Sequence, residues 1–284
     1  MKRLNRSLLA VTVAFVSIAE LASNASASRT TLSATSTPLP SSVEVILKGV
    51  HQVSKPAGAP LIDKSGETTY VDLDRTAYIV TASPNVAFTS VKTYFTVPSI
   101  TGCMGGAEDL ASLDGVNSPD FEQAGVFEYG CNGVTTAVMM YNVANYGAYY
   151  FGPVNPGDAI MAMVSVNSSQ QYLMQVKDLT TGAEIAVTQG CEYSSCPDGT
   201  AEVDVEPENI NGDNLADFTT VNFTGISITA NAANARHPIR GSLASKHGYW
   251  SSSVSYDIRN GKPLTDVSRL HGGRAFTVTW ESYY

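Results

Sequence analysis

The sequence has few charged residues, and the basic ones are the scarcest. Of its 284 residues, 17 are Lys or Arg and 26 are Asp or Glu, so charged residues make up 15% of the chain, against about 25% in typical soluble proteins. Outside the extreme N-terminus, no cluster of basic side chains offers a surface for a phosphate backbone. Nucleic acid is therefore excluded as an expected partner.

A run of the roughly 20 apolar residues that a membrane helix needs is also missing. The apolar stretch Ser7–Ala19 is shorter, follows a basic N-terminus and precedes the small residues Ala25–Ala27. This order is typical of a secretory signal peptide that is cleaved on export. We therefore expect residues 1–27 to be a signal peptide, and the mature protein to be secreted and not bound to a membrane.

Motifs for metal binding are absent as well. There is no C-x-x-C pair, and no histidine stands at ligand spacing from another histidine or from a cysteine pair. We therefore expect neither a metal nor another cofactor.

The four cysteines of the exported part are Cys103, Cys131, Cys191 and Cys196. An oxidising destination favours disulfides over thiols, and four cysteines allow three pairings. Proximity in the sequence favours Cys191 with Cys196, which leaves Cys103 for Cys131. Four unpaired, buried thiols are the alternative.

Amphipathic helices are missing, whereas alternation of apolar and polar residues is frequent. Runs such as 91–97 and 221–228 alternate with period two and are rich in β-branched and aromatic residues, which predicts half-buried strands. Turn signals such as Asn155–Asp158 and Asn260–Gly261 separate the runs. The pattern predicts an all-β protein, an antiparallel sandwich or barrel.

One domain is the simplest division of the chain after the signal peptide. Residues 28–42 are rich in Ser, Thr and Pro, a composition that predicts a disordered leader or a pro-segment. No repeat or second linker follows, so residues 43–284 are expected to form one β-sandwich domain that acts as a monomer. A small N-terminal subdomain ending before Val91 is the alternative.

The common hydrolase and nucleotide-binding motifs are absent: the sequence has no G-x-S-x-G, H-E-x-x-H, G-x-x-x-x-G-K, Asp-Thr-Gly or Asp-Ser-Gly. It offers instead three acids on one predicted strand, because Glu202, Asp204 and Glu206 point to the same face. Their repulsion raises at least one pKa if the face is partly desolvated, and such a carboxyl serves acid–base chemistry. An exposed, solubilising strand face is the alternative.

A second candidate is a glutamine among aromatic residues. In the run 120–129, Gln123 shares a face with Phe121, Phe127 and Tyr129. An amide on an apolar face is costly unless it is hydrogen-bonded. Gln123 is therefore either satisfied within the fold or presented in a cleft.

Together these segments resemble the glutamic peptidases, or eqolisins, a family of secreted, acid-active, pepstatin-insensitive endopeptidases. The resemblance extends from about Val91 to the C-terminus and rests on the order and spacing of short motifs. The matching motifs are Phe95-Thr96-Val97-Pro98, Leu113-Asp114-Gly115, Glu122-Gln123-Ala124-Gly125 and Ala201–Glu206. The resemblance implies a concanavalin A-like sandwich of two antiparallel sheets, bent so that a concave face holds the catalytic residues.

The resemblance also implies roles for individual residues. It places the catalytic glutamine on Gln123 and the catalytic glutamate on Glu206. Glu202 and Asp204 would tune the glutamate, and Asp114 would support it from a neighbouring position.

The sequence departs from the family in its cleft aromatics. The family's Trp-Tyr-Glu-Trp-Tyr-Pro segment corresponds roughly to residues 138–143, where Tyr141 is the retained aromatic and is expected to contact substrate or to support the residues that do. Met140 stands where the family has an acid, and Leu110 and Val203 stand where it has tryptophans.

The expected function is therefore acid endopeptidase activity on polypeptides, with Gln123 and Glu206 activating a water and no covalent intermediate. One alternative is a catalytically lapsed sandwich that binds glycans or peptides, because the tyrosines of segment 145–151 suit sugar stacking as well as core packing. A glycosidase that uses Glu206 with Asp204 is a third interpretation.

Overall fold

The computed structural model describes residues 61–62, 68–72, 75–103, 105–116, 118, 120–131, 134–144, 147–191, 196–207, 215–259 and 262–281. The expected signal peptide and leader, residues 1–42, lie outside these ranges. Every regular element in the described part is a strand. That part contains no helix long and apolar enough to cross a membrane.

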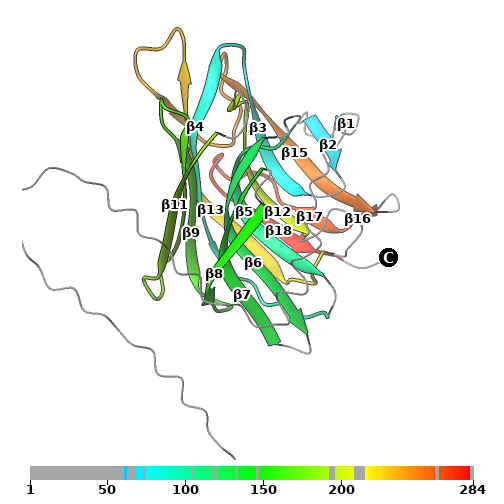
Figure 1. Cartoon of the computed structure of the whole chain (residues 1–284). Coiled ribbons are helices and arrows are strands. Elements are labelled where there is room, and N and C mark those ends of the chain that lie inside the picture. The colour runs from blue at the N-terminus through cyan, green and yellow to red at the C-terminus, as the bar shows by residue number, and fades with distance from the viewer. Residues whose placement is uncertain are drawn as a thin grey trace, which may run out of the picture. The chain divides into compact units, whose positions relative to one another are not determined.

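Ten strands form the larger of two sheets (Figure 1). Across the sheet the order is β1 (Leu61–Ile62), β2 (Thr68–Asp72), β15 (Trp250–Arg259), β3 (Thr76–Ala82), β12 (Thr200–Pro207), β5 (Gly106–Asp114), β6 (Phe121–Cys131), β7 (Val134–Val143) and β8 (Gly147–Val154), while β16 (Lys262–Pro263) pairs with β15. The strands with the predicted catalytic residues, β12 and β6, are separated by β5 alone.

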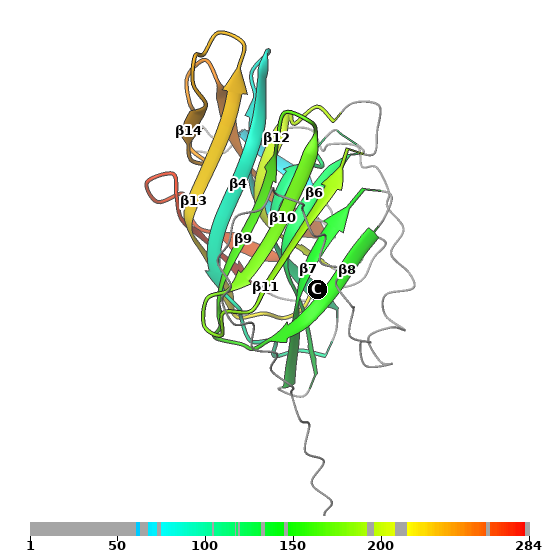
Figure 2. The ribbon, with the colours of Figure 1, turned by 60° about the vertical axis from the view of Figure 1, so that its left-hand side comes forward.

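Eight strands form the smaller sheet, and Figure 2 shows most of them side by side. Their order is β11 (Glu184–Gly190), β10 (Gln171–Asp178), β9 (Ala159–Val166), β4 (Val86–Thr96), β13 (Thr220–Ala232), β18 (Phe276–Trp280) and β17 (Thr265–Val267), while β14 (Ile239–Gly241) pairs with β13. Pairing within this sheet is antiparallel.

The hydrophobic core is shared by both sheets. Val126 and Val203 of the larger sheet and Val91, Val164 and Met174 of the smaller one are buried in a single cluster. Full burial of an apolar side chain of this size contributes about 1.5 to 3 kcal/mol. The inward stripe of each strand therefore stabilises the sandwich, as the period-two pattern of the sequence predicts.

The predicted all-β, antiparallel two-sheet sandwich is confirmed, with one local exception. Strand β2 pairs with β15 in parallel. The segment before Val91 contributes β3, which pairs with both β12 and β15 in the middle of the larger sheet. The strands described from Thr76 onward thus all belong to the sandwich.

Both disulfides join the cysteines that sequence proximity favours. Cys103 bonds to Cys131, and Cys191 bonds to Cys196. The described residues include no free cysteine. The predicted pairing is confirmed.

Candidate active site

The residues that alternate with the core residues form the outer face of the larger sheet. Val203 and Val205 of β12 belong to the core between the sheets. Because side chains alternate along a strand, Glu202, Asp204 and Glu206 point away from the smaller sheet. The predicted three-acid face is therefore present on β12.

Strands β5, β6 and β7 add polar side chains to the same face. Across the sheet, Ser112 of β5 stands opposite Glu202, Gln123 of β6 stands opposite Ser112, and Asn142 of β7 stands opposite Gln123. We call the surface formed by these residues and by Asp204 and Glu206 the acid–amide face.

Gln123 and Glu206 meet on the acid–amide face. Nε2 of Gln123 donates a hydrogen bond to Oε1 of Glu206 over 3.2 Å. Gln123 is 4% exposed, and the side chain of Glu206 is 13% exposed. The pair is thus largely withdrawn from water, while the carboxyl group keeps some access to it.

A glycine beside Gln123 allows strands β5 and β6 to approach closely. A Cβ atom added at Gly125 would lie 1.9 Å from the carbonyl oxygen of Asp109. No other residue fits there without separating the strands, which gives a physical reason for the glycine of the Gln123 motif.

Asn142 holds the other end of the Gln123 side chain, although the sequence analysis did not single it out. Its Nδ2 donates a hydrogen bond to Oε1 of Gln123 over 3.1 Å. The strand register of β6 and β7, which places the two residues opposite each other, is the signal that identifies it.

Arg75 lies just before β3 and is a second residue that the sequence analysis missed. Its Nη1 forms an ion pair with Oε2 of Glu202 at 2.6 Å, and its Nη2 lies 3.7 Å from Oε1 of Glu206. Glu202 is fully buried, so the guanidinium compensates a charge that would otherwise be costly. Arg75 thereby stabilises the carboxylates next to Gln123.

The Arg75→Met variant is expected to lower the free energy of unfolding by about 3 kcal/mol at pH 6, because it leaves buried carboxylates without a cation. The loss should be smaller at pH 3, where protonation relieves the repulsion. Urea unfolding followed by circular dichroism measures both values. Lys177→Met is the matched control, because Lys177 pairs with Glu184 at an exposed site where at most about 1 kcal/mol is expected. Equal losses in the two variants would contradict the assigned role of Arg75.

Asp204 lies between the other two acids of β12. Its side chain accepts a hydrogen bond from Oγ of Ser112 over 3.1 Å. Burial raises the pKa of Asp204 well above its ordinary value, and the charges of Glu206 and Glu202 raise it further. The predicted rise in the pKa of at least one of the three acids is therefore found at the central one, with burial as its main cause.

Asp114 binds the backbone of the turn that leads into β12, and its hydrogen bonds are not with Gln123 or Glu206. Its carboxyl oxygens accept hydrogen bonds from the backbone N–H groups of Asp198, Gly199 and Thr200 at 2.7, 2.6 and 3.2 Å. Burial raises the pKa of Asp114 to about 6, although the N–H donors of Thr200 and Gly199 oppose the shift. Asp114 thus holds the start of β12, the strand that carries Glu206.

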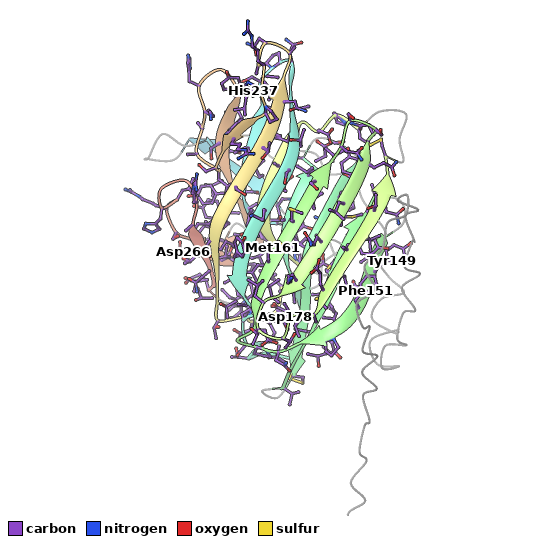
Figure 3. The ribbon with its side chains drawn as sticks, turned by 90° about the vertical axis from the view of Figure 1, so that its left-hand side faces the viewer. Tyr149, Phe151, Met161, Asp178, His237 and Asp266 are labelled. Carbon is purple, nitrogen blue, oxygen red and sulfur yellow. A yellow bond between two sulfur atoms is a disulfide. The ribbon has the colours of Figure 1, made fainter. Side chains whose placement is uncertain are left out.

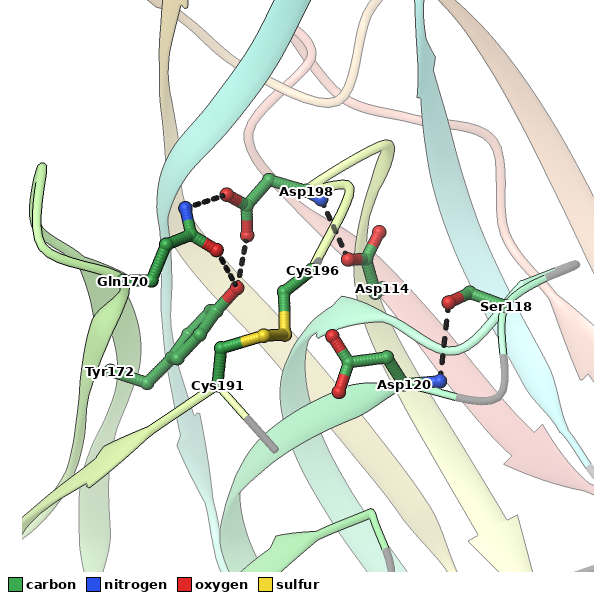
Figure 4. The surroundings of a disulfide bond; sticks show 8 residues. All are labelled: Asp114, Ser118, Asp120, Gln170, Tyr172, Cys191, Cys196 and Asp198. Atoms are coloured by element: carbon green, nitrogen blue, oxygen red, sulfur yellow. Dashed lines mark hydrogen bonds between the residues drawn. A yellow bond between two sulfur atoms is a disulfide. The ribbon is translucent and has the colours of Figure 1, made fainter. Parts of the chain in front are cut away.

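The disulfide Cys191–Cys196 lies close to Asp114 and to two other acids, Asp120 and Asp198 (Figure 4). Asp120 and the two cysteine sulfurs form a grouping of potential metal ligands within 4.8 Å of one another. Because both sulfurs are bonded to each other, this part of the described chain offers a single carboxylate from that grouping. It does not constitute a metal site.

Tyr141, which was expected to contact substrate or to support the residues that do, does not lie on the acid–amide face. It alternates with Asn142 on β7 and belongs to the core cluster. Its ring stacks on Tyr149 and Phe151, with centroids 4.9 and 5.5 Å away; Figure 3 shows both partners on β8.

An apolar cluster adjoins the polar residues of the acid–amide face. Leu110, Phe127, Val138, Met140 and Tyr150 are buried together. This surrounding lowers the local polarity, and hydrogen bonds and charges interact more strongly in such an environment. The face therefore combines a proton acceptor, an amide donor and a cation in surroundings of low polarity, which suits acid–base hydrolysis.

Comparison with protein families gave one match that covers most of the chain. The model described as the peptidase A4 family matches residues 77–280. A comparison with curated protein sequences found no match.

Comparison with solved structures found the same sandwich in three glutamic peptidases. Scytalidoglutamic peptidase with a peptide-based transition-state analogue has a TM-score of 0.59 at 22% identity, covering 74% of this chain and 99% of that one. SCP-B, a member of the eqolisin family solved with the tripeptide Ala-Ile-His, has a TM-score of 0.57 at 19% identity, with coverages of 74% and 99%. Aspergilloglutamic peptidase from Aspergillus niger has a TM-score of 0.51 at 23% identity, with coverages of 62% and 99%. At these identities the likeness shows a shared fold.

Proposed function

The chain belongs to the peptidase A4 family of glutamic endopeptidases, and from this premise we propose that it is secreted and hydrolyses polypeptides in acid with Gln123 and Glu206. The observation that carries the proposal is the 3.2 Å contact between Nε2 of Gln123 and Oε1 of Glu206. Peptide hydrolysis needs a base for water, a donor for the oxyanion and a proton for the leaving amine. One carboxyl and one amide supply all three.

In the first step, Glu206 acts as the general base. The water oxygen attacks the carbonyl carbon of the scissile peptide bond, while one water proton moves to the Glu206 carboxylate. Nη2 of Arg75 lies 3.7 Å from Oε1 of Glu206, so the cation stands beside the carboxyl group that takes the proton. Gln123 carries two N–H donors, and the one that does not face Glu206 is free to stabilise the developing oxyanion.

In the second step, Glu206 returns the proton. The tetrahedral intermediate collapses, the C–N bond breaks, and the proton moves from Glu206 to the departing nitrogen, so the products are an amine and a carboxylic acid. The carboxylate is regenerated without a covalent intermediate. The step needs no metal or cofactor.

Two alternatives from the sequence analysis receive less support. Tyr150 is buried in the apolar cluster, and Tyr149, at 38% exposure, stacks on a core residue, so the described tyrosines of segment 145–151 are used mainly in packing. The family match favours peptide bonds over glycosidic bonds as the substrate.

The proposal is tested with protein recovered from the culture medium and incubated with casein from pH 2 to 7, with and without pepstatin. We expect cleavage at acid pH that pepstatin does not inhibit. Gln123→Ala should reduce kcat by about 100- to 1,000-fold, the cost of removing one oxyanion donor. A Gln123→Ala protein that cleaves casein at the normal rate near pH 3 would show that the amide has no catalytic role.

A further inference from the structure

The orientation of the Gln123 amide decides whether it can act as proposed. A carboxamide can be turned by 180°, which exchanges its oxygen with its NH₂ group. In the turned orientation, the Gln123 oxygen would face the Glu206 carboxylate and no N–H donor would remain for an oxyanion. Something must therefore select one orientation.

Asn142 supplies the selecting contact at the end of the amide opposite Glu206. Its Nδ2 donates to Oε1 of Gln123 over 3.1 Å, while Nε2 of Gln123 donates to Glu206 over 3.2 Å. A turned amide would set two NH₂ groups against each other at one end and two oxygens against each other at the other. As long as Asn142 keeps its own amide orientation, each end thus disfavours the turned orientation of Gln123.

The Asn142 side chain shows signs of a role other than stabilising the fold. Its Oδ1 is buried and has no hydrogen-bond partner among the described residues. A buried, unsatisfied carbonyl is destabilising, commonly by about 1 to 3 kcal/mol, and native structures contain few of them. An apolar side chain would avoid this cost, whereas it would lose the bond to Gln123.

We infer that Asn142 is a positioning residue, which locks the Gln123 amide with its N–H groups toward Glu206 and the substrate oxyanion. The inference rests on the proposed function of Gln123 and Glu206. Asn142 acts through Gln123 and takes no part in proton transfer. The titratable and charged side chains on its face of the sheet include Arg75, Glu202, Asp204 and Glu206, together with Glu108, which stands opposite Glu206 on β5, and Tyr129 and Tyr150 on the neighbouring strands.

Two substitutions at this position separate the hydrogen bond from the packing. Asn142→Leu keeps the size of the side chain and removes the donor, so kcat should fall about 10- to 100-fold with KM changed less than about threefold. Asn142→Asp keeps the shape and makes the donor dependent on pH. A protonated carboxyl can donate to Oε1 of Gln123, whereas a carboxylate repels it.

The decisive readout is the pH profile of peptide hydrolysis by Asn142→Asp. We expect near-normal kcat at the most acid pH and a steeper loss as pH rises than in the wild type, with an unchanged melting temperature at acid pH. Asn231→Asp, which makes the same change at an exposed position of β13, should follow the wild-type profile. A wild-type profile for Asn142→Asp, or full kcat for Asn142→Leu, would overturn the inference.

NMR of the protein without substrate distinguishes failure of the positioning role of Asn142 from failure of the proposed function. The Gln123 side-chain N–H resonances, assigned by their loss in Gln123→Ala, should show one hydrogen-bonded proton in the wild type. That proton should be less protected in Asn142→Leu, where the contact with Glu206 alone holds the amide. If the wild type cleaves no peptide yet the resonances change in this way, the mechanism fails and the positioning contact stands; unchanged resonances refute the positioning role itself.

Discussion

Glu206→Gln is expected to lower kcat for peptide hydrolysis by at least about 1,000-fold, a larger effect than that of Gln123→Ala or Asn142→Leu. A general base contributes about 100- to 10,000-fold, and Glu206 is proposed to act both as base and as acid. The amide of glutamine keeps the shape of the side chain but can neither take a proton from water nor deliver one to the leaving nitrogen. KM should change little, because the substitution alters the reacting group and not the surrounding surface.

The measurement is kcat and KM on a chromogenic or fluorogenic peptide near pH 3, with the melting temperature recorded to show that the variant is folded. Glu184→Gln is the matched control: Glu184 lies on β11 of the smaller sheet and pairs with Lys177 at the surface. It should retain wild-type kcat. A folded Glu206→Gln protein with more than about a tenth of wild-type kcat would rule Glu206 out as the base.

The fold class was predictable from the sequence because buried and exposed positions of a strand alternate, and apolar and polar residues alternate with them. Strand β4 alternates as predicted, with Val91, Thr93 and Phe95 buried. Alternation tells which face of a strand is buried, but it does not tell which strands pair. For that reason the place of β3 between β12 and β15 and the parallel pairing of β2 with β15 could not be derived.

In the candidate site too, short motifs could be recognised in the sequence, whereas contacts between distant strands could not. Motif spacing pointed to Gln123 and Glu206, but these residues are not cross-strand neighbours: Gln123 stands opposite Ser112, and Ser112 stands opposite Glu202. Their contact depends on long side chains leaning along the sheet. Arg75 contacts acids of β12 in the same way and precedes the family match, which begins at residue 77.

For Tyr141, an uncertainty of one residue in the alignment decides which face of β7 the side chain lies on. Its segment was matched only roughly to the aromatic cleft segment of the family, and a shift of one position in a strand exchanges the two faces. The observed register puts Asn142 opposite Gln123. Asn142, and not the aromatic Tyr141, therefore lies on the acid–amide face.

The second large effect concerns stability: the free energy of unfolding is expected to fall by several kcal/mol as pH rises from about 4 to about 8. Asp109 of β5 and Glu128 of β6 are fully buried and alternate with residues of the acid–amide face, so they point between the sheets. Burial raises the pKa of Asp109 from its ordinary 3.8 to about 8. Burial and the charge of Asp109 raise the pKa of Glu128 well above its ordinary value.

The sign follows from the proton balance. Between the ordinary and the raised pKa, the folded protein keeps protons that the unfolded chain releases, so higher pH favours unfolding. Each such proton lowers the free energy of unfolding by about 1.4 kcal/mol per pH unit. The contribution is complete below about pH 4 and is lost above the folded pKa of about 8 for Asp109. This buried pair therefore favours the folded state in acid, the condition proposed for the activity.

Denaturant unfolding at each pH from 3 to 8 measures this slope, and an Asp109→Asn/Glu128→Gln double variant identifies its source. The uncharged amides titrate in neither state, so the double variant should lose most of the slope even if it is less stable in acid. Asp266→Asn, an exposed position of β17 (Figure 3), should keep the wild-type slope. Because Asp204 also has a raised pKa, a residual slope is expected. Stability that is flat from pH 4 to 8 in the wild type, or an undiminished slope in the double variant, would show that this buried pair is not what favours the folded state in acid.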